Sequence, residues 1–133
     1  MSKLKPLLLI VLALFMFAGC NEADDTVTMK VAASAYTSHV DQTSSTPFLG
    51  AWGDKLVPGV KSIAVSRDLI PKGLGHNAVV KIEGLDGEYL VKDKMNKRWT
   101  DKIDIYMGLD TKAAKDWGKR EVTITFKKPE PKK

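Results

Sequence analysis

The fold class of this chain is decided by residues 78–92, which read AVVKIEGLDGEYLVK. Residues 78–83 are rich in Val and Ile and predict a strand. Asp86-Gly87 is a hairpin signal, because a tight turn between strands needs residues that tolerate a positive φ. Residues 88–92 then return as the partner strand. The stretch therefore predicts an antiparallel pair of strands.

Further strands are predicted on both sides of this pair. Runs of strand character occupy residues 27–32 with a continuation to Tyr36, and residues 60–66, 103–107 and 121–126. Residues 37–50 are rich in Ser and Thr and predict a long surface loop. The chain has no alternation of strands with long helices, which disfavours a parallel α/β sheet. Six strands in an open sheet would leave two exposed edges, so we expect a closed, mainly β barrel.

A single short helix is predicted over residues 111–117. Asp110 has the character of an N-cap, and Gly118 suits the position just after the helix. Ala114 and Trp117 fall on one helix face, because residues three apart are neighbours on a helix surface. We expect this face to dock on the barrel.

The first nineteen residues have the form of an export signal. Lys3 and Lys5 form a short basic segment, and an apolar run of twelve residues follows over residues 7–18. That run is too short for a membrane-spanning helix, which needs ~20 apolar residues. We therefore exclude residues 1–19 from the folded domain.

The positive charge of the chain is concentrated at its C-terminus. The net charge is +5, but residues 20–126 carry fifteen basic and fifteen acidic side chains. Residues 127–133 read KKPEPKK and predict a basic tail. A nucleic-acid-binding domain would carry its basic residues on the folded body, so we expect no nucleic-acid partner. Residues 20–26 are polar and predict a tether, which leaves residues 27–126 as one domain.

Residues 17–20, Phe-Ala-Gly-Cys, resemble the lipobox of bacterial lipoproteins. The resemblance implies cleavage before Cys20, lipidation of its thiol and anchoring to a membrane. Asn21 follows in place of Asp, which in Gram-negative lipoproteins implies the outer membrane, facing the periplasm. Cys20 is the only cysteine, so an intrachain disulfide is impossible. The alternative is an ordinary signal peptide with an unrelated cysteine.

Three further segments resemble the 3D domain, a family named for three aspartates. They read IAVSRDLIPKG at residues 63–73, VKD at residues 91–93 and KIDIY at residues 102–106. The resemblance implies a six-stranded double-psi β-barrel. This is the fold of the catalytic domain of membrane-bound lytic transglycosylase A and, more distantly, of rare lipoprotein A and expansins.

The resemblance also implies a reaction, the cleavage of the β-1,4 bond between N-acetylmuramic acid and N-acetylglucosamine in peptidoglycan. Asp104 matches the third aspartate, the proposed catalytic acid and base, and Asp93 matches the second. Ser66 occupies the position of the first. A catalytic acid must hold its proton near neutral pH, so its pKa must rise well above ~3.9. Burial and the like charge of Asp93 are the two expected causes.

Four side chains are candidates for contact with the sugar. Trp99, Tyr36 and Trp52 can stack on sugar faces, and Arg98 can pair with a carboxylate of the muramyl peptide. Small barrels also need aromatic residues in their cores, so packing is the alternative for each ring. The two histidines lie far apart and lack metal-ligand spacing. We expect no metal and no cofactor.

Three functions are compatible with the sequence. The leading one is a lipid-anchored lytic transglycosylase that acts on peptidoglycan glycan strands, as a monomer. The second is a non-catalytic barrel that binds or loosens the wall. It is favoured by Ser66 and by Lys94-Met95-Asn96, where the family commonly has Thr-Gly-Gly. The third is a structural lipoprotein, for which we would expect a large exposed apolar patch.

Overall fold

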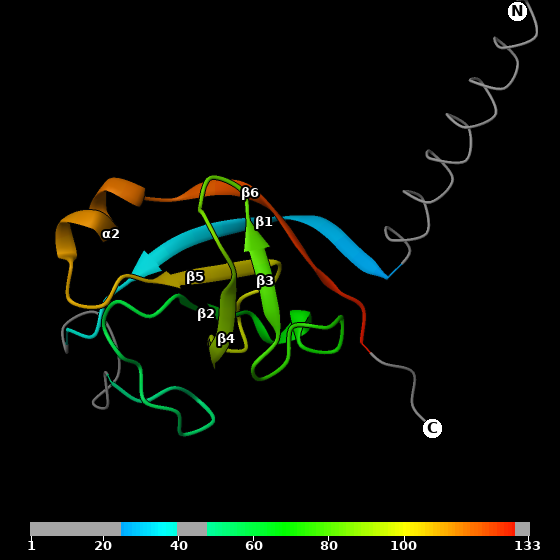
Figure 1. Cartoon of the computed structure of the whole chain (residues 1–133), viewed down its shortest axis with the longest axis horizontal. Helices are drawn as coiled ribbons and strands as arrows, with labels where there is room; N and C mark the ends of the chain where they lie inside the picture. Colours follow the sequence, from blue (N-terminus) through cyan, green and yellow to red (C-terminus); the bar gives the residue numbers. More distant parts are fainter. Residues whose placement is uncertain (1–24, 40–47, 130–133) are drawn as a thin grey trace, which may run out of the picture.

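Six strands, one α-helix and one short 3-10 helix form the part of the chain that the computed structural model describes, residues 25–39 and 48–129 (Figure 1). The strands are β1 (Thr26–Tyr36), β2 (Ser62–Val65), β3 (Val79–Ile82), β4 (Tyr89–Lys94), β5 (Lys102–Tyr106) and β6 (Arg120–Lys127). The helices are η2 (Arg67–Leu69) and α2 (Thr111–Trp117). Neither helix within these described ranges is long and apolar enough to cross a bilayer. The predicted signal segment, Cys20, most of the tether and the end of the basic tail lie outside these ranges.

The strands close into a barrel in the order β1-β5-β2-β4-β3-β6. The pairs β1–β5 and β2–β4 are parallel, and the other four pairs are antiparallel. The prediction of a mainly β, closed six-stranded barrel with one α-helix is confirmed, and the strand order is consistent with a double-psi barrel. Every strand edge is paired within residues 26–127, so the barrel folds without a strand from outside that range.

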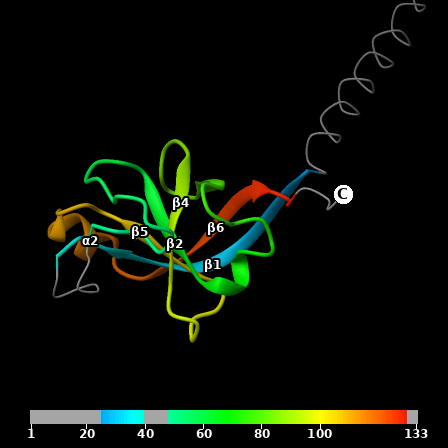
Figure 2. The ribbon, with the colours of Figure 1, turned by 90° about the horizontal axis from the view of Figure 1, so that it is seen from below.

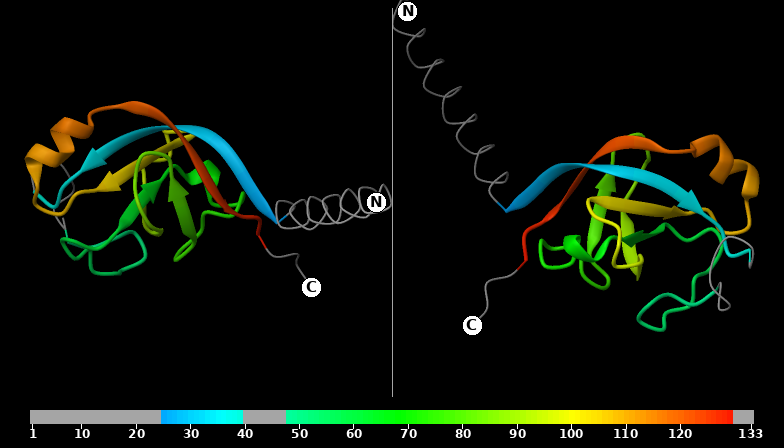
Figure 3. Two further views of the ribbon diagram at one scale, coloured as in Figure 1. Left: turned by 45° about the horizontal axis from the view of Figure 1, so that its top comes forward. Right: turned by 180° about the vertical axis from the view of Figure 1, so that it is seen from behind.

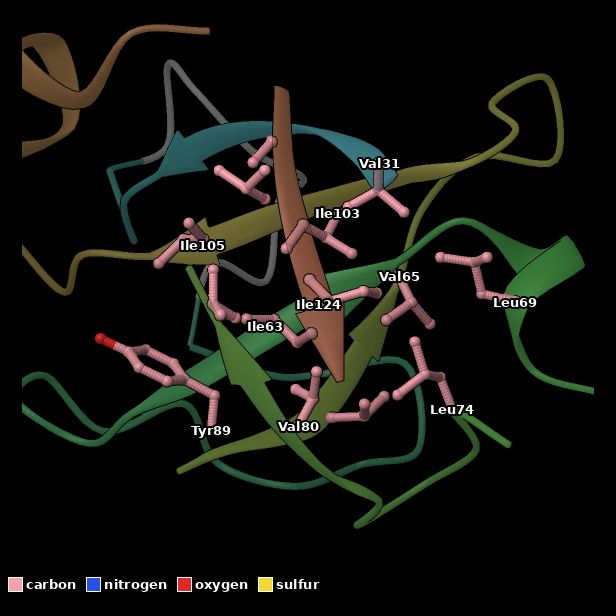
Figure 4. Packing of buried hydrophobic residues seen from close by; sticks show 14 of the residues in the cluster. Val31, Ile63, Val65, Leu69, Leu74, Val80, Tyr89, Ile103, Ile105 and Ile124 are labelled. Atoms are coloured by element: carbon pink, nitrogen blue, oxygen red, sulfur yellow. The ribbon is translucent and has the colours of Figure 1, made fainter. Parts of the chain in front are cut away.

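The interior of the barrel is filled by aliphatic side chains that alternate along each strand (Figure 4). Ile63, Val65, Ile103, Ile105 and Ile124 are fully buried and point toward one another. Full burial of such a side chain stabilises a fold by ~1.5–3 kcal/mol. The residues between them on each strand face out of the barrel, because successive side chains on a strand point to opposite sides. This alternation decides which polar residues are available for function.

Helix α2 docks as the sequence predicts. The Asp110 carboxylate accepts a hydrogen bond from the Ala113 N–H at 2.9 Å and caps the helix. Trp117 is only 8% exposed, and its Nε1–H donates to the Ala33 carbonyl of β1 at 3.2 Å. Gly118 has a φ of 66°, which ends the helix at a conformation that glycine adopts readily.

Two strand boundaries differ from the prediction by two residues, and the others by one at most. Strand β2 begins at Ser62, because Val60 still belongs to the preceding turn and donates its N–H to the Val57 carbonyl at 3.1 Å. Strand β4 extends to Lys94, past the predicted end at Lys92. A β-bulge lies opposite Ile63 and Ala64, and it allows β4 to continue along β2.

The first and last residues of the barrel sequence lie next to each other. Thr26 pairs with Lys127 across β1 and β6, and the Lys128 N–H donates to the Asp25 carbonyl at 2.9 Å. Figure 2 and Figure 3 show the start of β1 beside the end of β6, at the end of the molecule opposite α2. The two termini of the domain therefore lie together and far from α2.

Candidate functional site

The two aspartates selected from the sequence lie on the outside of the barrel, on either side of one alanine. Ala64 of β2 is in register with Asp104 of β5 and with Asp93 of β4. With neighbouring strands ~4.8 Å apart, the two aspartate Cα atoms are ~10 Å apart. Ser34 of β1 is in register with Asp104 on its other side. We call these four outward positions, Ser34, Asp104, Ala64 and Asp93, the carboxylate face.

The bulge in β4 is what places Asp93 on this face. Val91 is in register with Ile63 and points into the core, but the next residue in register, opposite Ala64, is Asp93 and not Lys92. In a regular strand Asp93 would point to the same side as Val91, because side chains alternate. The extra residue, Lys92, therefore turns Asp93 outward.

Asp104 has a pKa that lies much closer to neutral pH than that of an ordinary aspartate. Burial raises its pKa to about 6, and the charge of Asp93 adds to the rise. The Ser34 hydroxyl donates to Asp104 Oδ1 at 3.1 Å and opposes the rise, as does the charge of Lys102. The net result is a carboxyl group that can both donate and accept a proton near pH 6.

Asp93 is held by backbone groups. Its Oδ1 accepts hydrogen bonds from the Ala51 N–H at 2.8 Å and the Lys94 N–H at 2.9 Å. Burial raises the pKa of Asp93, and these two bonds and the charge of Lys94 oppose the rise. The Ala51 contact ties the loop of residues 48–56 to the face. Gly50 in this loop lies against the Lys92 carbonyl, where a Cβ would come within 2.1 Å of the oxygen.

Tyr36 is placed differently from its predicted role as a sugar-stacking platform. Its ring is 9% exposed and lies 5.3 Å from the ring of Tyr106, centroid to centroid. Within the described residues its hydroxyl oxygen is buried as well and has no hydrogen-bond partner. Burial, together with the charges of Asp93 and Asp104, raises the pKa of Tyr36 far above its usual range. The hydroxyl therefore stays a proton-bearing donor beside the two carboxylates.

Trp99 and Arg98 lie in the loop between β4 and β5, next to the carboxylate face. Trp99 is 37% exposed. The Lys102 Nζ lies 3.9 Å and the Arg98 Cζ 4.9 Å from the centroid of its ring. Lys102 is two residues before Asp104 and shares its side of β5, so it links Trp99 to the face. The loop thus contributes one partly exposed ring and two cations.

Trp52 contacts a different set of residues. Its ring stacks on His76 with centroids 4.9 Å apart, and the Lys94 Nζ lies 5.6 Å from its centroid. His76 Nε2 in turn pairs with the Asp54 carboxylate. Trp52 therefore helps to hold the 48–56 loop near Asp93.

Ser66, at the position of the family's first aspartate, has a structural role. It is fully buried, its Oγ accepts a hydrogen bond from the Lys102 N–H at 3.0 Å, and its N–H donates to the Lys102 carbonyl at 2.8 Å. Asp68, two residues later, accepts from the Asp101 N–H at 2.9 Å. Both residues fix the start of β5 and do not add a third carboxylate to the pair.

Sequence reasoning did not select Ser34, Lys102 or the Asp54–His76 pair. Their place near the two aspartates follows only from strand register or from a loop contact between residues distant in sequence. Ser34 had one detectable signal, its place on the polar side of the alternating strand that ends at Tyr36. Among residues 25–39 and 48–129, no group of three His, Cys, Asp or Glu side chains is arranged to hold a metal ion.

A second feature lies on the other side of the barrel. A hollow of about 570 Å³ is formed between β3, β6 and the start of β1. It is lined by Thr26, Gly73, Ala78, Val79, Lys81, Glu88, Thr125, Phe126, Lys127 and Lys128. None of the sequence-selected residues belongs to it, and it holds one carboxylate instead of a pair. The pair of carboxylates therefore distinguishes the carboxylate face from this hollow.

Comparison with known proteins gives a likeness of architecture only. No family model matches the chain, and no curated protein sequence matches it. A mutant expansin from Clavibacter michiganensis, solved in complex with cellohexaose, aligns over 80% of this chain and 53% of that chain, with a TM-score of 0.47 and 15% identity. The apo expansin of that organism aligns over 80% and 52%, with a TM-score of 0.47 and 16% identity. The chain spans about half the length of these expansins, and at this level the likeness bears on neither its activity nor its ligand.

Proposed function

We propose that the carboxylate face binds the glycan strands of peptidoglycan and that Asp104 is the general acid and base for their non-hydrolytic cleavage. The observation that carries this proposal is the pair of outward carboxylates flanking Ala64, with the pKa of Asp104 raised to about 6. A group with such a pKa is suited to general acid–base catalysis near neutral pH. The resemblance of residues 63–73, 91–93 and 102–106 to the 3D domain supports the same reaction.

The proton balance of this reaction needs one carboxyl group. Protonated Asp104 gives its proton to the glycosidic oxygen as the bond from that oxygen to the muramyl anomeric carbon breaks. The muramyl 6-hydroxyl oxygen then bonds to the same carbon, and its proton returns to Asp104. The product is a 1,6-anhydro ring, and no water is consumed. Burial keeps the pKa of Asp104 high, and the charge of Asp93 adds to the rise.

Cationic side chains around the face suit a substrate that carries carboxylates. Lys102 and Arg98 lie against Trp99, and Lys94 lies between Asp93 and Trp52. The lactyl and peptide carboxylates of muramic acid would pair with such groups, and a neutral glucan would not. The substrate class we propose is therefore an acidic, peptide-bearing glycan.

The test is the product released from purified peptidoglycan by residues 21–133, read by mass spectrometry. We expect anhydromuropeptides from the wild type and at least ~100-fold less from Asp104→Asn, in line with the loss of a general acid. Asp116→Asn, an exposed carboxylate on α2, is the matched control and should retain activity. Products with ordinary reducing ends would instead show hydrolysis, and the proposed chemistry would be wrong.

A second candidate, a non-catalytic barrel that binds or loosens the wall, is favoured by a specific observation. Asp93 already accepts two backbone hydrogen bonds, and Met95 packs beside the Tyr36–Tyr106 cluster where the family commonly has glycine. This candidate predicts co-sedimentation with peptidoglycan that survives Asp104→Asn, and no anhydro product from the wild type.

We also propose that Cys20 carries a lipid and that the protein faces the periplasm from the outer membrane. The support is the Phe-Ala-Gly-Cys sequence at residues 17–20, followed by Asn21. Cys20→Ser should release the protein into the soluble fraction of the cell envelope. Retention of this variant in the membrane fraction would contradict lipidation at Cys20. A wild type that sediments with the inner membrane would contradict the outer-membrane location.

A further inference from the structure

The hollow between β3 and β6 combines cationic and apolar lining at the end of the barrel where the chain leaves. Lys81, Lys127 and Lys128 line it, and among the described residues none of these three lysines forms an ion pair. Val79 lines it too and is 44% exposed. Glu88 is the one acidic residue of the lining, so the hollow has a net charge of +2. An anionic ligand with an adjoining apolar part fits this chemistry.

The position of the hollow relates it to the chain that precedes the barrel. Thr26 lines the hollow and is the first residue of β1, six residues after Cys20. Six extended residues span at most ~20 Å. A chain held at Cys20 therefore keeps the hollow close to whatever surface holds Cys20.

The carboxylate face lies away from this end. Ser34 is eight residues along β1 from Thr26, a path of ~26 Å at the rise of a strand. Figure 1 shows the start of β1 and the end of β6 on the side of the barrel opposite α2. A surface that contacts the hollow therefore leaves the carboxylate face pointing away from it.

We propose that the β3–β6 hollow binds the headgroups of anionic phospholipids. Its three lysines meet the phosphate groups and Val79 meets the interface below them. The barrel is thereby held with its carboxylate face directed away from the bilayer. Headgroup binding stands on the hollow alone, whereas the statement about orientation rests on the proposed lipid at Cys20.

The test uses residues 21–133, which contain the whole closed barrel and lack Cys20, so that binding does not depend on the anchor. Vesicles of phosphatidylcholine with phosphatidylglycerol are compared with vesicles of phosphatidylcholine alone, in a flotation assay at low salt. Each lysine near an anionic surface is worth about fivefold in partitioning. The variant with Lys81, Lys127 and Lys128 changed to Gln should bind anionic vesicles at least tenfold more weakly.

The matched control changes Lys112, Lys115 and Lys119 to Gln, which removes the same charge at the α2 end. It should bind anionic vesicles like the wild type. An equal loss of vesicle binding in both variants, or no loss in the first variant, would overturn the proposal. Binding of the wild type to an anionic wall polymer but not to vesicles would overturn it as well. The first variant should keep full activity on soluble glycan fragments, so failure at the hollow and failure at the carboxylate face are distinguishable.

Discussion

Replacing Asp104 with Asn should make the protein more stable at neutral pH, and the gain should disappear in acid. Folding moves this carboxyl group from water into a half-buried position, where its pKa rises from 3.8 to about 6. The folded protein therefore binds the proton more tightly than the unfolded chain does. As a result, the wild type loses stability as the pH rises from about 4 to about 6. Asn keeps the shape and the oxygen that accepts from Ser34, but it has no proton to lose.

The magnitude follows from the change in pKa. A rise from 3.8 to about 6 corresponds to ~3 kcal/mol of stability lost once Asp104 is ionised. The side chain keeps some contact with water, which screens its charge, so the expected gain for Asp104→Asn at pH 7.5 is ~1–2 kcal/mol. For a domain of this size the gain corresponds to a midpoint of thermal unfolding ~4–8 °C higher.

Thermal and urea unfolding of residues 21–133 at several pH values between 4 and 8 would measure this. The curves of wild type and Asp104→Asn should converge near pH 4 and separate above pH 6. The control, Asp116→Asn, removes an exposed carboxylate and should keep the pH dependence of the wild type. The reasoning is refuted if Asp104→Asn is the less stable protein at pH 7.5, or if its difference from the wild type is the same at every pH.

Two further variants test the arrangement around Asp104, and a third tests the docking of α2. Asp93→Asn removes the neighbouring charge, so the pKa of Asp104 should fall. The alkaline limb of the pH–activity profile should therefore move to lower pH. An unmoved limb would show that the two carboxylates are uncoupled. Tyr36→Phe removes a buried hydroxyl without a partner in the described residues, so we expect ~1 kcal/mol more stability in urea unfolding. Trp117→Ala empties the contact between α2 and β1 and should cost ~3–5 kcal/mol in the same assay; a cost below ~1 kcal/mol would show that α2 contributes little to stability.

The strands and the helix were predictable because their signals are local. The alternation in residues 121–126 and the Asp110 cap are visible within a few residues of sequence, and the structure has a strand and a helix there. The boundaries of β2 and β4 were less accurate, because a turn and a bulge decided them. Both depend on contacts with other parts of the chain.

The candidate site was predictable only as a set of residue types. Asp93 and Asp104 were selected through the family resemblance, but their alignment beside Ala64 depends on a bulge and on pairing between strands far apart in sequence. Tyr36 was expected to offer its ring, yet barrel closure buries both the ring and its hydroxyl. Composition does not distinguish an aromatic residue that packs from one that binds, because both uses need the same side chain.

The first and last residues of the barrel sequence lie side by side where β1 pairs with β6, so the two could be joined covalently. Asp25 and Lys128 are already hydrogen-bonded, so a short glycine-rich linker could join them, and the chain could be opened between Gly118 and Lys119. Such a circular permutant would keep every strand neighbour while moving the point of attachment to the end that carries α2. An anchor placed there would present the α2 end of the barrel to the surface that holds the anchor. The end of the barrel that faces such a surface thus depends on where the chain is opened, and it can be changed without altering a residue of the carboxylate face.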